Sequence, residues 1–137
     1  MRAFLAAVAA SALSCAHYAT LVTVPIGSDE AWLLVGDAFE FLTDELPPAT
    51  TVLVFPRDSE TDPLNGGLQR VCTANGYALG VAHGPSAALR VWASFRHAGG
   101  GYLLEVDLGG VAMTRWYTRT PSGKLVPAGP RAVRRAS

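Results

Sequence analysis

The sequence predicts an α+β fold in which two helices pack on one face of a largely antiparallel four- to five-stranded sheet. In residues 28–46 and 62–75, apolar side chains recur at the three- and four-residue spacing of helices that bury one side. From Tyr77 onward, apolar and polar residues alternate instead, as in strands with one covered face. Glycine-rich connections at residues 99–101 and 109–110 favour antiparallel hairpins between these strands. Helices followed by hairpins are typical of α+β domains.

Length and composition indicate one folded domain. The chain has 137 residues and half of them are apolar, which is enough to build a core. The formal net charge is zero, so nothing indicates binding to nucleic acid. The charges are nevertheless separated, because residues 15–62 carry nine acids and one base, whereas residues 63–137 carry nine bases and two acids. Two interpretations remain open: the two parts pair within one molecule, or the molecule stacks on copies of itself or on a complementary partner.

The N-terminal stretch resembles a bacterial lipoprotein signal. One base precedes an apolar run of 11 residues, which is shorter than the roughly 20 residues that a membrane-spanning helix needs. Residues 11–15 (SALSC) resemble a lipobox, in which a peptidase cuts before the cysteine and the thiol carries diacylglycerol. We therefore expect a signal peptide over residues 1–14, a lipid on Cys15 and a linker over residues 15–27. An ordinary signal cut nearby and an uncleaved anchor are the alternatives.

The residue after this cysteine and the second cysteine complete the N-terminal prediction. Ala16, in place of an aspartate, favours the outer membrane over the inner membrane under enteric-type sorting rules. With Cys15 acylated, Cys72 has no disulfide partner. Because Cys72 falls in a helical pattern, we expect a small buried hydrophobic residue there, and a reactive thiol is the alternative.

The first helix is predicted from Ser28 or Asp29 to the prolines at positions 47 and 48. Acids in the first turn suit the positive end of the helix dipole, and prolines end helices. Its buried stripe consists of Ala31, Leu34, Val35, Ala38, Phe41 and Leu42. On the opposite side we expect three acids to form a solvated face, although paired carboxylates also serve as acid–base couples. These acids are Asp37, Glu40 and Asp44.

A short strand, an acidic loop and the second helix follow. Residues 50–55 are β-branched and apolar, as expected for a covered strand. Asp62 is placed to cap the second helix ahead of Pro63. The buried side of this helix is predicted to hold Leu64, Leu68, Val71 and Cys72. Glycines at 66 and 67 are unusual inside a helix and indicate close packing; a phosphate-binding loop is the alternative, but the matching glycine patterns are absent.

The helices cover one face of the predicted sheet, so the other face is open. Alternation places five side chains on this open face: Arg90, Trp92, Arg96, Glu105 and Asp107. An exposed tryptophan among arginines suits a protein interface, and solvated cross-strand pairing is the alternative. The globular domain is expected to span residues 28–128. Beyond it lies a basic tail over residues 129–137, in which we expect residues 131–135 to be frayed and solvated.

The sequence holds no recognisable catalytic constellation. His17, His83 and His97 lie far apart and lack neighbours at metal-ligand spacing, so we expect surface histidines. The GxSxG, HExxH and CxxC patterns are absent. We therefore expect neither an enzyme, nor a metal site, nor a cofactor.

Four short stretches stand out between Asp37 and Arg131. They are residues 46–51 (LPPATT), 76–77 (GY), 115–117 (RWY) and 125–129 (LVPAG), with Leu68 before the second and Leu79 after it. Together they resemble the conjugal transfer protein TrbH family, whose members are small lipoproteins of the mating-pair-formation apparatus, a type IV secretion system. The family often has a tryptophan soon after the last stretch, where Pro130 and Arg131 stand here.

The resemblance implies a structural or assembly lipoprotein of a conjugative type IV secretion system, on the periplasmic face of the outer membrane. Its implied partners are the membrane, through the lipid on Cys15, and protein subunits of the secretion channel, with self-association as a further option and no direct contact with nucleic acid. A periplasmic binding or accessory module, which regulates an envelope enzyme or holds a small ligand, is the alternative.

Two sets of residues are candidates for partner contacts, and one further pair is expected to be structural. The first set, Arg90, Trp92 and Arg96, lies on the predicted open face. The second set, Asp58, Glu60 and Asp62, lies in the loop where the acidic part of the chain ends. Arg115 and Tyr117 share one face of a strand, and we expect the arginine to hold carbonyl groups of residues 127–129.

Overall fold

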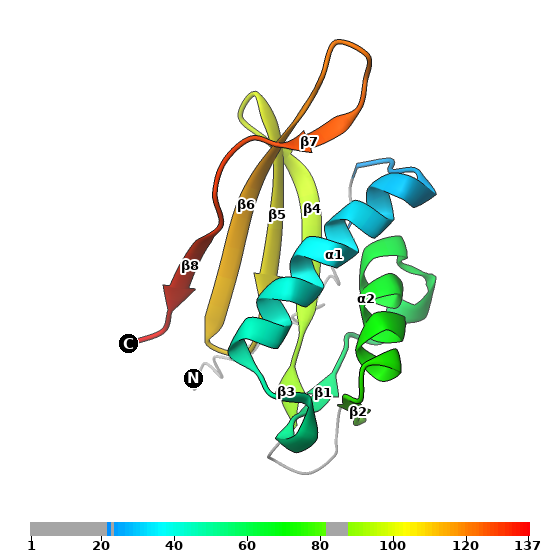
Figure 1. Ribbon diagram of the computed structural model, residues 1–137, viewed down its shortest axis with the longest axis vertical. Coiled ribbons are helices and arrows are strands. Elements are labelled where there is room, and N and C mark those ends of the chain that lie inside the picture. Colours follow the sequence, from blue (N-terminus) through cyan, green and yellow to red (C-terminus); the bar gives the residue numbers. More distant parts are fainter. Residues whose placement is uncertain (1–21, 23, 82–87) are drawn as a thin grey trace, which may run out of the picture.

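The computed structural model describes residues 22, 24–81 and 88–137 (Figure 1). The predicted signal peptide, Cys15, His17 and His83 lie outside these residues. The elements along the chain are α1 (Ser28–Glu45), η1 (Pro48–Thr50), β1 (Val52–Val54), η2 (Ser59–Thr61), α2 (Pro63–Ala74), β2 (Ala78–Leu79), β3 (Leu89–Arg90), β4 (Trp92–Ala98), β5 (Gly101–Asp107), β6 (Val111–Arg119), β7 (Leu125–Pro127) and β8 (Ala132–Arg135). Two helices and a largely antiparallel five-stranded sheet confirm the predicted α+β class.

The larger sheet has the strand order β4-β5-β6-β7, and β8 pairs with the other half of β6. All of these pairings are antiparallel. The two predicted glycine turns connect β4 to β5 and β5 to β6. Gly109 and Gly110 have φ of 68° and 121°, which residues with a side chain rarely adopt. The glycines therefore fix where each hairpin turns.

A second, smaller sheet is not predicted by the sequence pattern. It is parallel, with the order β2-β1-β3. Its strands are two or three residues long, which is too short to produce a recognisable alternation. Val91, the residue between β3 and β4, donates its backbone N–H to the carbonyl of Val54 at 2.9 Å. The continuous segment from β3 to β4 therefore contributes one strand to each sheet.

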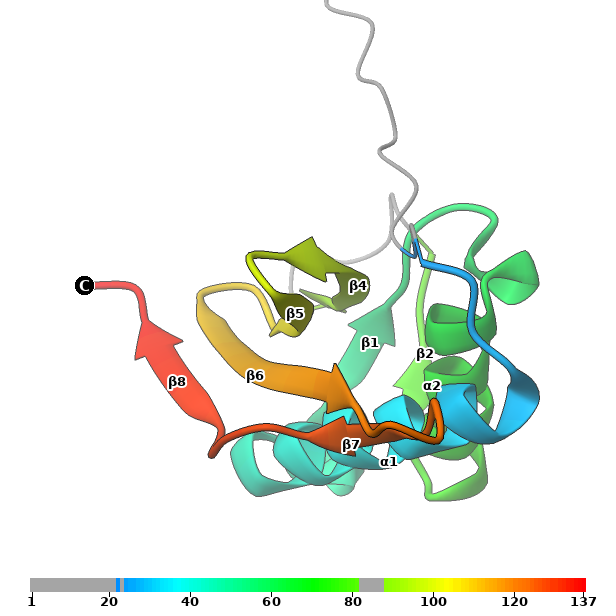
Figure 2. The same ribbon diagram turned by 90° about the horizontal axis from the view of Figure 1, so that it is seen from above.

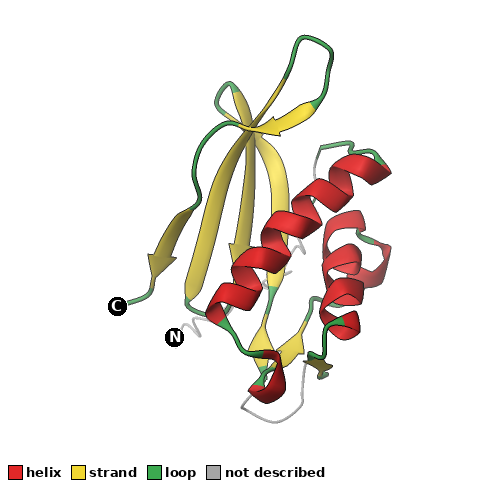
Figure 3. Ribbon diagram, in the orientation of Figure 1, coloured by secondary structure: helices red, strands yellow, loops and turns green. Residues whose placement is uncertain are grey.

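The two helices lie side by side on one face of the larger sheet (Figures 2 and 3). The predicted α1 stripe is buried in full, with Ala31, Leu34, Val35, Ala38, Phe41 and Leu42 all inside. It packs against the inward side chains of the sheet, which include Ala93, Phe95, Leu104, Val106, Met113 and Tyr117. The rings of Phe95 and Tyr117 meet edge to face with centroids 5.9 Å apart. The core therefore lies between α1 and the middle of the sheet.

The start of α2 has the predicted cap and the predicted close packing. The carboxylate of Asp62 accepts hydrogen bonds from the backbone N–H groups of Leu64 and Asn65 at 2.9 and 2.8 Å. A Cβ at Gly66 would lie 2.8 Å from the carbonyl oxygen of Glu60, and one at Gly67 would lie 2.8 Å from a methyl group of Val35. Both glycines therefore allow α2 to approach its neighbours.

Alanine substitutions at two helical glycines are expected to shift stability in opposite directions. Gly66→Ala forces a methyl group against backbone atoms, which costs about 1–3 kcal/mol. Gly36→Ala in α1 meets nothing within 4 Å and should stabilise the protein by about 0.5–1 kcal/mol through helix propensity. Urea unfolding followed by circular dichroism measures both changes. Midpoints that move in the same direction for the two variants would contradict the packing described for α2.

The interpretation of residues 131–135 as a frayed tail is wrong for the part that forms β8. Residues 132–135 pair with β6 in the register Thr114↔Ala132 to Val111↔Arg135. The strand is exposed, yet it completes backbone hydrogen bonds along a β6 edge that β7 leaves uncovered. Composition alone suggested a solvated tail because it does not reveal this edge.

Candidate functional site

The acidic and basic parts of the chain meet along a seam between α1 and the C-terminal strands. Five acids of α1 form ion pairs with four arginines that follow β5: Glu30–Arg119, Asp37–Arg115, Asp37–Arg131, Glu40–Arg131, Asp44–Arg131 and Glu45–Arg135. Of the two interpretations of the charge separation, pairing within one molecule is thus confirmed for α1. This seam also holds the C-terminal segment beside the helix.

Asp37 is the centre of this seam. Its side chain is 11% exposed, and its carboxylate accepts hydrogen bonds from the guanidinium of Arg115 at 2.7 Å and from the hydroxyl of Tyr117. Arg115 also donates from Nε to the carbonyl oxygen of Gly129 at 3.1 Å. The structural role expected of Arg115 and Tyr117 agrees with these contacts. The solvated face predicted for Asp37 is wrong, because α1 turns this residue toward β6.

A second pair closes the seam near the start of α1. Arg119 donates to both carboxylate oxygens of Glu30 and, at 2.8 Å, to the carbonyl oxygen of Gly123 in the turn before β7. Its guanidinium carbon lies 5.4 Å from the centre of the Tyr102 ring. The hydrogen bond from Arg119 lowers the pKa of Glu30 below its ordinary value. Arg119 therefore joins the helix, the sheet and the turn.

The stretches that resemble the family pattern form hydrogen bonds to one another. The hydroxyl of Tyr77, from the GY stretch, donates to the carbonyl oxygen of Leu46, the first residue of the LPPATT stretch, at 2.6 Å. The RWY and LVPAG stretches meet through Arg115 and Gly129. Four stretches that are distant in sequence thus form two pairs of contacts in space.

Asn65 is a buried polar residue that the sequence reasoning missed. Its side chain is fully buried and pairs with both backbone groups of Ala93 in β4: the amide nitrogen donates to the carbonyl at 2.7 Å, and the amide oxygen accepts from the N–H at 2.8 Å. On the same edge, Val91 pairs with Val54, and Phe95 forms a bridge with Val22. An asparagine between an N-cap and two glycines is a weak signal, since its partner lies 28 residues away.

The cysteine and histidine predictions can be checked within the described residues. Cys72 is buried, and burial raises the pKa of its thiol to about 12, which makes it an inert hydrophobic residue as expected. His97 is exposed and lies beside the ring of Tyr102. Within residues 22, 24–81 and 88–137, no group of three or more histidine, cysteine or acidic side chains could hold a metal ion.

The open face of the larger sheet carries both predicted and unpredicted residues. Strand register places Trp92 opposite Asp107, and Leu103 opposite Trp116, on the side away from the helices. Trp92 is half-buried, whereas Arg90 and Arg96 are exposed. Trp116 was not selected from the sequence as a contact residue, although the residue is 46% exposed. Alternation along β6 puts Trp116 on the same face as Thr114 and on the opposite face from Arg115. This pattern could have identified Trp116 as an open-face residue.

The predicted loop acids have different roles. Asp58 and Glu60 are exposed around η2, whereas Asp62 is engaged as the cap of α2. Among the described residues, no ion pair joins these acids to the arginines of β3 and β4. The two predicted sets of contact residues therefore lie on separate elements.

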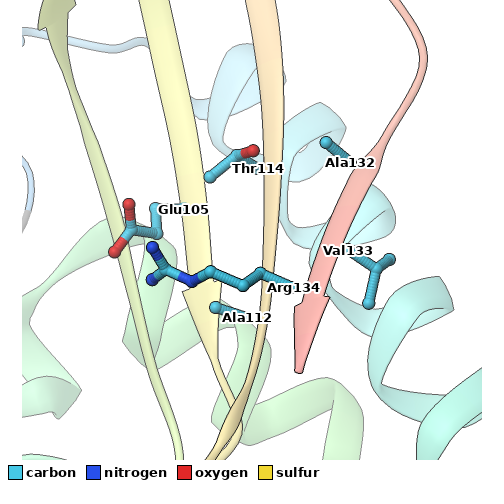
Figure 4. Close-up of a pocket in the computed structure, with 6 residues that line it drawn as sticks. All are labelled: Glu105, Ala112, Thr114, Ala132, Val133 and Arg134. Carbon is cyan, nitrogen blue, oxygen red and sulfur yellow. The ribbon is translucent and has the colours of Figure 1, made fainter. Parts of the chain in front are cut away.

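A depression of about 180 Å³ lies on the open face, between β5, β6 and β8 (Figure 4). It is lined by Glu105, Ala112, Thr114, Ala132, Val133 and Arg134. Figure 4 shows the side chain of Arg134 extending from β8 toward Glu105 on β5. Small side chains thus form a recess that has one acid and one base at its border.

Comparisons with known proteins identify the family. The family model for conjugal transfer protein TrbH matches residues 16–136. Neither a curated protein nor a solved structure matches the chain. In the part that the structure describes, no helix is both long and apolar enough to cross a membrane. With a match over nearly all of its length, the chain belongs to the TrbH family of conjugal transfer proteins.

Proposed function

We propose that the protein is a lipid-anchored assembly component of a conjugative type IV secretion apparatus, at the periplasmic face of the outer membrane. The family match over residues 16–136 carries this proposal. The match begins directly after Cys15, so the stretch assigned to a signal peptide lies outside the matched region. A lipid on Cys15 would place the whole family domain next to the membrane surface.

The spacing between Cys15 and the fold supports a short tether. Six residues separate Cys15 from Val22, which forms a backbone bridge with Phe95 on β4. A chain of this length reaches at most about 25 Å. In this proposal the domain therefore stays close to the lipid headgroups, where other envelope subunits of the apparatus can meet it.

Three residues outside the seam form the proposed contact with another subunit. Arg90 and Arg96 are exposed on either side of Trp92, and none of the three takes part in the seam. Arginine and tryptophan are enriched where protein interfaces bind most strongly. We assign these residues to a contact with a channel subunit. Asp58 and Glu60 form a second, acidic site of the same kind, whereas Asp62 is held by its capping role.

Palmitate labelling in cells tests the anchor, and Cys72→Ser supplies the matched control. The wild-type protein and Cys72→Ser should both be labelled and should fractionate with the outer membrane. Cys15→Ser should lose the label, leave the outer-membrane fraction and lower the frequency of conjugal transfer. Absence of label on the wild-type protein, or label retained by Cys15→Ser, would overturn the lipid anchor.

A pull-down from detergent-solubilised envelopes tests the assembly role. Wild-type protein should retain identified subunits of the transfer channel, and the double variant Arg90→Ala with Arg96→Ala should retain less of them. Asp29→Ala, which removes an exposed charge on α1, is the control and should retain as much as wild type. A wild-type protein that retains no channel subunit would contradict the assembly role.

A further inference from the structure

Trp116 is an exposed aromatic side chain on a sheet face that no described element covers. Strand register places Trp116 on the opposite face of β6 from the inward residues Arg115 and Tyr117, and opposite Leu103 on β5. It also lies beside Gly101, where an added Cβ would be 4.0 Å from the indole edge. Such an exposed indole contributes a large contact area when a partner surface covers it. The chain therefore presents a projecting group on this face.

The same face also presents a recess of suitable size. The depression has a volume of about 180 Å³, and its lining includes the small side chains of Ala112, Thr114 and Ala132. An apolar cavity of about 150 Å³ accommodates a benzene ring, so a recess of this volume admits the larger part of an indole. Thr114 is two residues from Trp116 on β6, which places the recess and the projecting group next to each other.

We infer that the part of this face formed by β5, β6 and β8 is occupied by a second copy of this chain, with each Trp116 seated in the depression of the other copy. A projecting group and a recess on one face form a self-complementary surface, and a twofold axis near Thr114 makes the same contact twice. Two sheets packed face to face in this way lie about 10 Å apart, which is within reach of a tryptophan side chain.

The charges in the depression suit this occupant. The guanidinium of Arg134 borders the recess and can stack on the partner's Trp116. Glu105 balances this charge, so the recess presents one acid and one base to the incoming copy. Two identical faces therefore meet without a net like-charge repulsion. The contact concerns β5, β6 and β8 and does not depend on the proposed function or on the lipid.

Sedimentation equilibrium of the full chain in a non-ionic detergent tests this pairing. Wild-type protein should form dimers. Trp116→Ala removes the projecting group and Ala132→Trp fills the recess, so each should raise the dimer Kd at least about tenfold. Trp32→Ala removes an indole that is 53% exposed on α1 and should leave the Kd unchanged. Unfolding midpoints identify any variant that is not folded.

A mixture of the two weakened variants distinguishes self-pairing from other occupants. Trp116→Ala keeps an intact recess and Ala132→Trp keeps an intact indole, so together they should form a mixed dimer more tightly than either pairs with itself. A monomeric wild-type chain, or a dimer that Trp116→Ala does not weaken, would overturn the inference. If the wild type is monomeric and Trp116→Ala loses a channel subunit in the pull-down, the face belongs to that subunit instead.

Discussion

Replacement of Asn65 by leucine is expected to destabilise the protein by about 2–4 kcal/mol, although both side chains have the same number of heavy atoms and branch at Cγ. The substitution removes both hydrogen bonds to Ala93. The backbone N–H and carbonyl groups of Ala93 are then left without partners in a fully buried environment. Each unpaired buried group costs about 1–3 kcal/mol. Urea unfolding measures the loss, and light scattering should report increased aggregation, because the outer edge of β4 loses a cover.

Asn75→Leu is the matched control for this prediction. Asn75 follows α2, is exposed, and donates one side-chain hydrogen bond to the carbonyl of Val71. The same change of residue type there should alter stability by less than about 1 kcal/mol, because water replaces the lost bond. Equal losses at positions 65 and 75 would show that the pairing with Ala93 contributes nothing specific.

Asp37→Ala is expected to cost about 2–4 kcal/mol and to loosen the C-terminal strands. The substitution leaves the buried hydroxyl of Tyr117 without its acceptor and separates Arg115 from its ion-pair partner. Removing one member of a largely buried charged network costs more than removing an exposed pair, since its partners stay desolvated. Thermal unfolding measures the loss, and faster amide hydrogen exchange in β8 should accompany it.

Asp44→Ala tests whether charge alone explains this effect. The side chain of Asp44 is 68% exposed, and its Oδ2 lies 3.8 Å from Nη1 of Arg131. Its removal should therefore lower the free energy of unfolding by less than about 0.5 kcal/mol. A double-mutant cycle between Asp37 and Arg115 should give a coupling energy of about 1 kcal/mol or more. Additive losses in this cycle, or similar losses for the two aspartates, would exclude the central role assigned to Asp37.

Much of the fold could be predicted from local patterns. The α1 stripe, the cap at Asp62 and the alternation in β4 to β6 are each encoded within a few neighbouring residues. The parallel sheet is encoded differently, because β1 pairs with residues that follow it by 26 positions in β2 and by 36 positions in β3. Two- or three-residue strands contain too few positions for a pattern, so only tertiary contact defines them.

The residues of the candidate site show the same division between local and distant information. The charge separation along the sequence left pairing within one molecule and stacking between molecules open, and it did not show that Asp37 would be the centre of the ion pairs. The helical pattern was interpreted as placing Asp37 on the side opposite the apolar stripe, whereas the position of β6 decided its burial. Asn65 and Trp116 depend in the same way on which strand lies opposite them.

The attachment of Val22 and of β8 to the larger sheet has a mechanical consequence. Val22 runs parallel to β4 and β8 runs antiparallel to β6, so the N-terminal side of Val22 and the C-terminal side of Arg135 point to the same end of the sheet. Tension between these two points acts across the strands and opens backbone hydrogen bonds one pair at a time, instead of loading them together in shear. β8 should peel first, from Arg135 toward Ala132, while the central hairpins stay intact. We therefore expect a domain pulled in this way to yield at low force by extending β8.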